Sequence, residues 1–150
     1  MKIKNFQDKL QLLRDVFLGV LDQNFLARCY FIKPYVLCKT GSVVTVLTET
    51  DFTFDEDPNA LKLPIVSLHG DFLILENFIA KNSDKISPAT LLTENPFGVA
   101  YIRMLQAGLL ESYKGERQKF YLEVFDTWCE ANKDKIKKIT FPDWVRLNKQ

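Results

Sequence analysis

The sequence predicts an α+β fold with a long N-terminal helix, a small antiparallel sheet built on one β-hairpin, and a C-terminal array of three to four helices. Three observations lead to this prediction. Apolar residues near the N-terminus recur at helical spacing, two β-rich runs flank a glycine turn, and two proline-marked helix starts follow in the second half. A chain of 150 residues has the usual size of one domain, so we expect residues 1–150 to form a single globular domain.

The N-terminal helix is predicted over about residues 5–27. Its apolar residues follow one another at steps of three or four, which places their side chains on one face of a helix. These apolar residues are Phe6, Leu10, Leu13, Phe17, Val20 and Leu21. Asn5 is expected to cap the first turn, because its side-chain oxygen can accept a hydrogen bond from a backbone N–H group there.

The hairpin region is predicted over about residues 29–54. Two short runs of aromatic and β-branched residues are divided by Pro34, and a returning strand at residues 42–48 follows the turn at Gly41. Residues 50–54 alternate polar and apolar side chains. They would therefore extend the returning strand or add a third one.

The segment after the hairpin is predicted to be an acidic surface loop over residues 55–64, because its charges and prolines break the strand pattern. Residues 63–68 would form a further short edge strand. A helical region is then expected over about residues 71–138, with Asp71 as the N-cap of its first helix. Residues 72–75 form an apolar run that leaves helix and strand both open, and we favour helix.

Two later helices are predicted to begin at Pro88 and Pro96, each of which follows a capping Ser or Asn. The second of these helices is expected to end near Gly115. Gly108 would allow the close approach of a neighbouring element. A last long helix would then begin at Glu116.

Composition excludes several classes of function. Twenty Lys and Arg residues against nineteen Asp and Glu residues leave a formal charge of +1, so no global field would draw the chain to nucleic acid or to an anionic membrane. No uncharged run approaches the roughly 18 residues of a spanning helix, and Asp22 interrupts the stretch that would have to serve as a signal peptide. Three cysteines without Cys-x-x-Cys spacing are typical of buried free thiols in a reducing compartment. We therefore expect a soluble, cytoplasmic protein with no membrane partner.

No complete catalytic motif is present, and no cofactor or metal is predicted. Phosphate-binding glycine loops are absent, and one histidine with three scattered cysteines does not make a usual zinc site. The one place for acid–base or nucleophilic chemistry is His69, with Cys38 as the nucleophile and Asp71 as the residue that orients the imidazole. The simpler interpretation, which we favour, is that His69 and Asp71 begin a helix and bind backbone groups.

The densest acidic patch follows the hairpin and contains Asp51, Asp55 and Asp57. The pattern Asp55-x-Asp57-x-Asn59 matches the first three ligand positions of a calcium-binding EF-hand loop, but the glycine and the bidentate glutamate of that loop do not follow. We therefore predict a solvated acidic loop that offers a surface to a basic partner.

The C-terminus carries the opposite charge. Residues 133–150 contain six basic residues and two acidic ones, and residues 139–150 are predicted to form a basic tail. The candidate binding residues here are Lys133, Lys137, Lys138, Trp144, Arg146 and Lys149. The Trp144 ring beside the Arg146 cation is suited to stacking on a nucleic-acid base or to anchoring a protein interface. The alternative is a tail whose apolar residues pack back on the domain while its lysines stay in solvent.

These observations favour a non-enzymatic protein-binding or accessory protein, such as an adaptor, an inhibitor or a small complex subunit, that acts through its charged patches. Its partner would be another protein or a second copy of the chain, since opposite local charges suit both. The first alternative is a nucleic-acid-associated accessory protein that uses the basic tail. The second alternative is a small Cys/His-dependent enzyme centred on His69.

Overall fold

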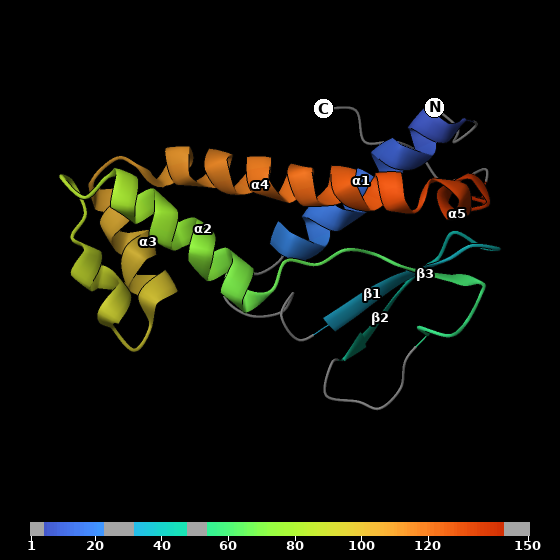
Figure 1. Cartoon of the computed structure of the whole chain (residues 1–150), viewed down its shortest axis with the longest axis horizontal. Coiled ribbons are helices and arrows are strands. Elements are labelled where there is room, and N and C mark those ends of the chain that lie inside the picture. Colours follow the sequence, from blue (N-terminus) through green and yellow to red (C-terminus); the bar gives the residue numbers. More distant parts are fainter. Residues whose placement is uncertain (1–4, 23–31, 48–53, 143–150) are drawn as a thin grey trace. The chain divides into compact units, whose positions relative to one another are not determined.

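The computed structural model describes residues 5–22, 32–47 and 54–142, and it has the predicted α+β architecture (Figure 1). These residues contain five α-helices, one short 3-10 helix and a three-stranded antiparallel sheet. Within these ranges, no helix has both the length and the apolar content to cross a membrane.

The chain divides into two compact units. The first unit combines Met1–Ile65 with Val124–Gln150, and the second unit is Val66–Glu123. The second unit is therefore one continuous stretch of chain, whereas the first unit needs both ends of the sequence. The expectation of a single domain stays a prediction.

The first unit begins with α1, Phe6–Asp22, which follows the predicted helical spacing. Its most buried residues are Leu13, Phe17 and Leu21. The Oδ1 atom of Asn5 accepts the backbone N–H of Asp8 at 2.9 Å, so the predicted cap is confirmed. The predicted continuation of this helix to residue 27 lies outside the described residues.

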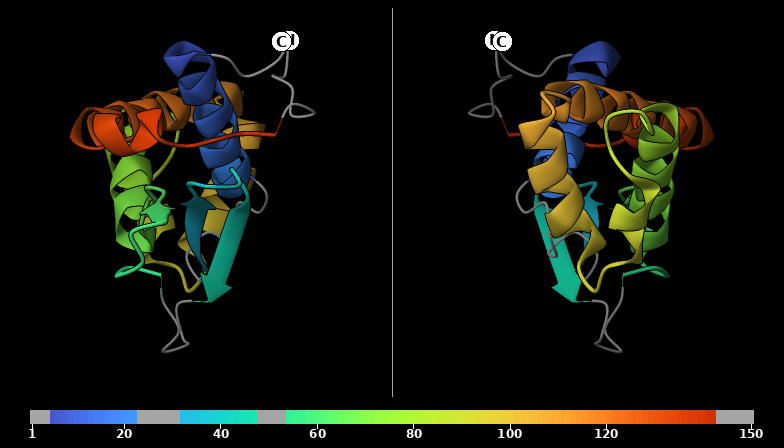
Figure 2. Two further views of the ribbon diagram at one scale, coloured as in Figure 1. Left: turned by 90° about the vertical axis from the view of Figure 1, so that its right-hand side faces the viewer. Right: turned by 90° about the vertical axis from the view of Figure 1, so that its left-hand side faces the viewer.

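The sheet of the first unit has the strand order β2-β1-β3. The central strand β1, Ile32–Leu37, pairs antiparallel with β2, Val43–Leu47, and with β3, Ala60–Lys62. Figure 2 shows β1 and β2 side by side, and their pairing confirms the predicted hairpin. Pro34 does not divide two runs as expected but lies inside β1, where its carbonyl accepts the N–H of Leu63 at 2.9 Å.

The edge strand predicted at residues 63–68 is wrong. The third strand comes earlier, as β3, and takes up part of the predicted loop at residues 55–64. The N–H of Leu63 donates to the carbonyl of Pro34 at 2.9 Å, and residues 64–67 no longer lie in a strand. The chain leaves the sheet there and enters a helix.

Helix α4 spans Leu110–Ala131. Its last part, from Val124 onward, belongs to the first unit and packs against α1. The rings of Phe17 and Phe125 stack with their centroids 5.5 Å apart. The indole N–H of Trp128 donates to the carbonyl of Lys62 at 2.9 Å, which ties the same helix to the edge of the sheet. Helix α4 is therefore joined to α1 by stacked rings and to the sheet edge by a hydrogen bond.

The short helix α5, Lys133–Lys137, completes the first unit. Its Ile136 side chain is fully buried. The Nζ atom of Lys9 donates to the carbonyl of Lys137 at 2.7 Å, and this contact satisfies a carbonyl at the C-terminal end of α5. A cation at this end also complements the helix dipole.

The hairpin turn packs against the segment that follows α5. Gly41 has a φ of +70°, and a Cβ atom at this position would lie 2.6 Å from the ring of Phe141. Glycine is therefore required both for the backbone conformation and for the space. The N–H of Thr140 donates to the carbonyl of Cys38 at 2.8 Å, so this segment is also hydrogen-bonded to the turn.

The second unit begins with α2, Leu68–Lys81, which is capped by Ser67. The Ser67 Oγ atom accepts the N–H of Gly70 at 3.0 Å. The prediction that Asp71 is the N-cap is wrong, because Asp71 lies within the first turn and its side chain is buried. Residues 72–75 are helical, as favoured from the sequence.

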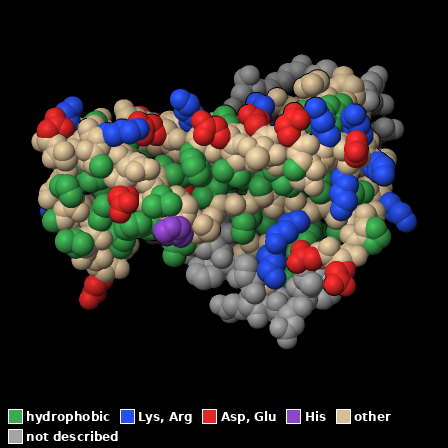
Figure 3. Space-filling view, viewed as in Figure 1, with side chains coloured by type: hydrophobic (Ala, Val, Ile, Leu, Met, Phe, Trp, Pro, Cys, Tyr) green, Lys and Arg blue, Asp and Glu red, His purple; other side chains and the backbone are tan. Residues whose placement is uncertain are grey.

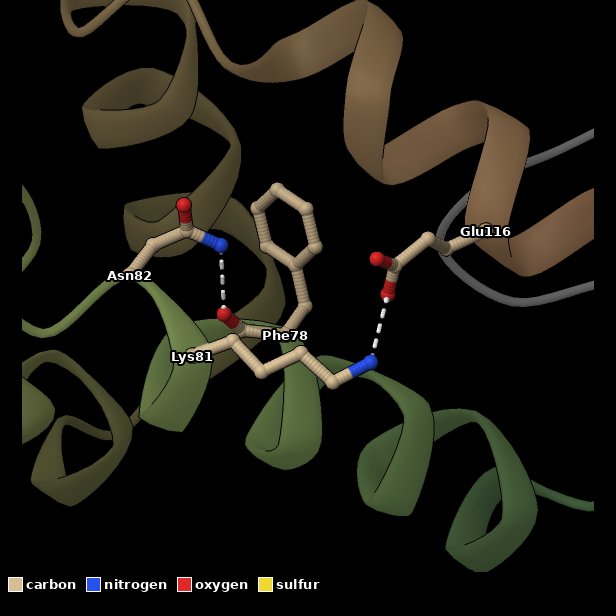
Figure 4. A network of polar contacts seen from close by, with 4 residues as sticks. All are labelled: Phe78, Lys81, Asn82 and Glu116. Atoms are coloured by element: carbon tan, nitrogen blue, oxygen red, sulfur yellow. Dashed lines mark hydrogen bonds and ion pairs between the residues drawn. The ribbon is translucent and has the colours of Figure 1, made fainter.

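The C-terminal end of α2 is fixed by polar contacts, which Figure 4 shows from close by. The Nδ2 atom of Asn82 donates to the carbonyl of Phe78 at 2.9 Å. The ammonium of Lys81 lies 3.6 Å from a carboxylate oxygen of Glu116 on α4. Both contacts lie within the second unit. The first satisfies a carbonyl near the end of α2, and the second joins that end to α4.

Both proline-marked helix starts are confirmed. The 3-10 helix η2, Pro88–Leu92, follows the capping residue Ser87, and α3, Pro96–Gln106, follows Asn95. Each capping side chain accepts a backbone N–H group, at 3.2 Å for Ser87 and at 3.1 Å for Asn95.

The junction between α3 and α4 lies at Gly108, so the predicted junction at Gly115 is wrong. Gly108 has a φ of +70°, and its N–H donates to the carbonyl of Leu105 at 3.2 Å. The N–H of Leu109 donates to the carbonyl of Met104 at 2.8 Å, which completes a Schellman motif. A Cβ at Gly108 would meet no atom within 4 Å, so glycine serves the positive φ here and not the expected close approach.

Candidate functional site

The acidic loop uses its side-chain oxygens to hold the first unit together. An Asp55 carboxylate oxygen accepts the hydroxyl of Tyr35 on β1 at 2.7 Å. Asp57 accepts the N–H of Asn59 at 2.8 Å, and the Asn59 amide oxygen accepts the N–H of Lys39 at 3.0 Å. The three residues that match the start of an EF-hand loop therefore brace a turn, while Asp51 lies outside the described residues.

One lysine of α5, Lys135, lies beside this loop. Lys135 and Asp55 line one hollow of about 240 Å³, together with Tyr35 and Lys62. Figure 3 shows Lys and Arg side chains gathered where Figure 1 labels α5, with Asp and Glu side chains among them. Asp55 of the acidic loop and Lys135 of α5 thus lie in one neighbourhood of the first unit, which the sequence could not show.

The other predicted basic residues are placed differently. Lys133 lies 3.3 Å from Glu130, and the Lys137 ammonium lies 5.6 Å from the centroid of the Phe6 ring. Lys138 lies near Cys38. The tail residues Trp144, Arg146 and Lys149 lie outside the described residues.

The two described cysteines are free thiols. Burial raises the pKa of Cys38, and nearby Lys135 and Lys138 oppose that rise while Asp57 adds to it. Burial also raises the pKa of Cys129, to about 11. Both side chains are therefore neutral thiols near pH 7 and weak nucleophiles.

His69 and Asp71 occupy the first turn of α2, but their side chains have different surroundings. His69 is exposed, whereas only 4% of Asp71 is exposed. An Asp71 carboxylate oxygen accepts the hydroxyl of Tyr121 at 2.5 Å. Cys38 belongs to the first unit and His69 to the second, so the pairing of His69 with Cys38 stays a prediction.

Sequence reasoning missed the buried polar cluster around Asp71. Tyr113, Arg117 and Tyr121 follow at intervals of four residues on α4, and the Arg117 guanidinium lies 5.8 Å and 5.7 Å from the two ring centroids. Burial raises the pKa of Tyr113 to about 12, with Asp71 adding to the rise and Arg117 opposing it. The four-residue spacing was visible in the sequence, but the buried carboxylate that it serves was not.

A groove also lies in the second unit, where α2 and α3 begin. This α2–α3 groove has a volume of about 500 Å³. Its apolar lining consists of Leu68, Phe72, Pro96 and Phe97, and its polar lining consists of His69, Glu94 and Asn95. Figure 3 shows the histidine in purple at the surface, with hydrophobic side chains in green beside it.

Large apolar side chains are exposed in the same unit, and Leu68 of the groove is one of them. Leu92 at the end of η2 is 87% exposed, and the other examples in this unit are Leu68, Leu73, Ile102, Leu105 and Phe120. Single exposed leucines are ordinary in folded proteins, but a groove that combines the exposed Leu68 with two phenylalanines is typical of a binding surface. The α2–α3 groove is therefore the candidate binding site of the second unit.

Comparison of the chain with protein families, with characterised proteins and with solved structures found no match. In the part of the chain that the structure describes, no three His, Cys, Asp or Glu side chains are grouped so as to hold a metal ion. Function therefore has to be argued from the surfaces of the two units.

Proposed function

We propose that this protein is a non-enzymatic accessory protein that binds a second protein through the α2–α3 groove. The observation that carries the proposal is an apolar hollow of about 500 Å³ with a polar edge on the surface of the second unit. Protein interfaces commonly enclose an apolar centre within a polar rim. The proposal keeps the accessory role expected from the sequence and moves it from charged patches to an apolar site.

The groove is built for contact without rearrangement. Phe72 and Phe97 pack edge to face with their ring centroids 6.3 Å apart, and each is anchored on its own helix. A preformed wall loses little conformational entropy when a partner arrives. Leu68 is 52% exposed, and burying the rest of its side chain would contribute about 1 kcal/mol to binding.

The rim defines the chemistry of the partner. Glu94 is exposed beside the apolar lining and carries the negative charge of the groove. A partner segment that combines one large apolar side chain with a nearby Lys or Arg would fill the hollow and pair with Glu94. His69 and Asn95 offer further polar groups at the same edge.

The rival functions have weaker support. The proposal of two opposed charged docking surfaces has less support, because Asp55 and Asp57 of the acidic loop accept hydrogen bonds from the first unit itself. Asp55 also lies near Lys135 of α5 and not on an opposite surface. The enzyme alternative loses support because Asp71 is engaged by Tyr121 and burial raises the pKa of Cys38. One observation still supports the nucleic-acid alternative: two basic residues, Lys9 and Lys137, lie close together where α1 contacts α5.

The test compares two lysine substitutions on α2. Leu68→Lys places a charge in the groove, while Leu73→Lys places the same charge on the same helix at an exposed residue that does not line the groove. Tagged proteins are incubated with a lysate of the source cells, and retained proteins are quantified by mass spectrometry. We expect one protein to be retained equally by the wild type and Leu73→Lys and at least tenfold less by Leu68→Lys, a loss of about 1.4 kcal/mol. A photo-crosslinking residue at position 68 should join to that protein, and one at position 73 should not.

Two outcomes would contradict the proposal. One is a retained protein that binds Leu68→Lys as well as it binds the wild type, with circular dichroism showing that all variants are folded. The other is salt-sensitive binding of oligonucleotides that Leu68→Lys leaves unchanged while no protein is retained, which would replace protein binding by the nucleic-acid function.

A further inference from the structure

A second concavity of the second unit has a different chemistry from the α2–α3 groove. It lies between the turn that follows α2, η2 and the end of α3, and its volume is about 500 Å³. Its polar lining residues are Lys85, Ser87, Thr90, Thr93, Arg103 and Gln106. No acidic residue is among the described residues that line it, so the pocket carries two positive charges and no negative one.

The two cations have no carboxylate partner within the described residues. Other lysines of the same unit do have one, since Lys81 pairs with Glu116 and Lys114 pairs with Glu111. Lys85 and Arg103 make no such ion pair in the part of the chain that the structure describes. Asp84 and Glu94 are close in sequence, but neither carboxylate lines the pocket. Two cations facing one cavity without a counter-charge attract an anion.

The walls of the pocket are held in place by hydrogen bonds. The backbone N–H groups of Lys85 and Ile86 each donate to the carbonyl of Asn82 at 2.9 Å, and Asn82 is itself bound to the end of α2 (Figure 4). Arg103 projects from the last turns of α3. The backbone that carries both cations is therefore fixed before a ligand arrives.

Hydroxyl groups complete the polar lining. The Ser87 Oγ atom accepts the N–H of Ala89 at 3.2 Å, which leaves its own O–H group to donate. The Thr93 hydroxyl donates to the carbonyl of Thr90 at 3.2 Å, which fixes the turn after η2. Ile86, Ala89 and Ala107 add apolar wall, so the cavity has room for an organic group as well as for an anion.

From this arrangement we infer that the pocket binds a small phosphate monoester. The planar guanidinium of Arg103 can donate two parallel hydrogen bonds to a phosphate, and Lys85 supplies a second positive charge. Two cations match the two negative charges of a monoester near neutral pH. A volume of about 500 Å³ exceeds what the phosphate itself needs and matches small-ligand pockets, so the ester carries a small organic group against the alanine and isoleucine walls.

The test uses phenyl phosphate and inorganic phosphate as probes, with amide chemical shifts of the full-length protein as the readout. We expect saturable shifts at residues 85–93 and 103–107 with phenyl phosphate, and weaker binding of inorganic phosphate. Lys85→Gln and Arg103→Gln should each weaken phenyl phosphate binding at least tenfold, the equivalent of about 1.4 kcal/mol. Lys119→Gln removes an exposed lysine of the same unit that does not line the pocket, and it should leave the binding unchanged.

Three results would overturn the inference. The first is the absence of saturation below about 10 mM probe, which is weaker than a specific site provides. The second is equal binding by wild type, Lys85→Gln and Arg103→Gln. The third is equal binding of the two probes, since the organic group would then contribute nothing. Leu68→Lys should not alter the binding of either probe, so this test and the test of the groove can fail separately.

Discussion

Asp71 is a carboxylate with only 4% of its surface exposed, and it lies in the first turn of a helix whose cap is another residue. A carboxylate near a helix N-terminus is favoured by the helix dipole, but burial removes it from water. The Tyr121 hydroxyl replaces part of that hydration, and Tyr113 and Arg117 lie in the same cluster. Asp71, which the sequence offered as a residue to orient the His69 imidazole but more readily as part of a helix start, thus has a structural role in the second unit.

Removing the Tyr121 hydroxyl should destabilise the protein. We expect Tyr121→Phe to lower the free energy of unfolding by about 1 to 3 kcal/mol, because a buried acceptor loses its donor. Urea unfolding of Tyr121→Phe, Asp71→Asn and the double variant measures the coupling between the two side chains. A coupling energy near zero would mean that the hydrogen bond contributes nothing beyond packing.

Alkaline pH should weaken the second unit through Tyr113. Burial raises the pKa of Tyr113 from 10.0 to about 12, so the folded state holds the phenol proton more tightly than the unfolded state does. The resulting stability is fully present below about pH 10 and is lost as the pH rises through about 12, at up to about 1.4 kcal/mol per pH unit. The urea midpoint of the wild type should therefore fall relative to that of Tyr113→Phe when the pH is raised from 9 to 11.5. A constant difference between them would contradict this explanation.

At the scale of elements, local signals set where most helices begin. Asn5, Ser87 and Asn95 each accept a backbone N–H as the sequence pattern predicts. Helix ends were harder to predict, because Gly108 and Gly115, which are about two helical turns apart, offered the same local signal. The structure uses Gly108 as the junction and continues α4 through Gly115.

The two glycines should respond to alanine in opposite ways. Gly108→Ala forces an L side chain into φ +70° and should cost about 1 to 2 kcal/mol of stability. Gly115→Ala adds a good helix former inside α4, where a Cβ meets no atom within 4 Å, and should add about 0.5 to 1 kcal/mol. Thermal or urea unfolding decides the sign. A stabilising Gly108→Ala or a destabilising Gly115→Ala would disprove the assignment of the junction.

At the scale of the whole molecule, the chain makes two compact units with different connectivity. The first unit joins α1 and the sheet to the end of α4 and to α5, so its core depends on both ends of the sequence. The second unit is continuous from Val66 to Glu123. Each unit has its own fully buried isoleucine, Ile136 in the first and Ile79 in the second.

Core truncation should act mainly within its own unit. Ile136→Ala and Ile79→Ala should each cost about 2 to 5 kcal/mol, because each removes a fully buried side chain. Hydrogen exchange should show lost protection in β1–β3 and α1 for Ile136→Ala, and in α2 and α3 for Ile79→Ala. A uniform loss across the chain in both variants would instead indicate one cooperative domain, as expected from the sequence.

The sequence by itself determined the α+β class, the hairpin and the starts of α1, η2 and α3. These features depend on neighbouring residues, through apolar spacing, side-chain caps and proline at the first helical position. Such signals act over a few residues, so one sequence is enough to read them.

Only the tertiary structure decided which functional residues meet. It placed the acidic loop beside Lys135, engaged Asp71 with Tyr121 across 50 residues of sequence, and opened the α2–α3 groove between two helix starts. In the tertiary structure α4 also continues through Gly115, and the buried residues Tyr113 and Tyr121 lie before and after this glycine on the same helix. The physical reason is that burial and pairing depend on contacts distant in sequence, for which local propensity is a weak guide.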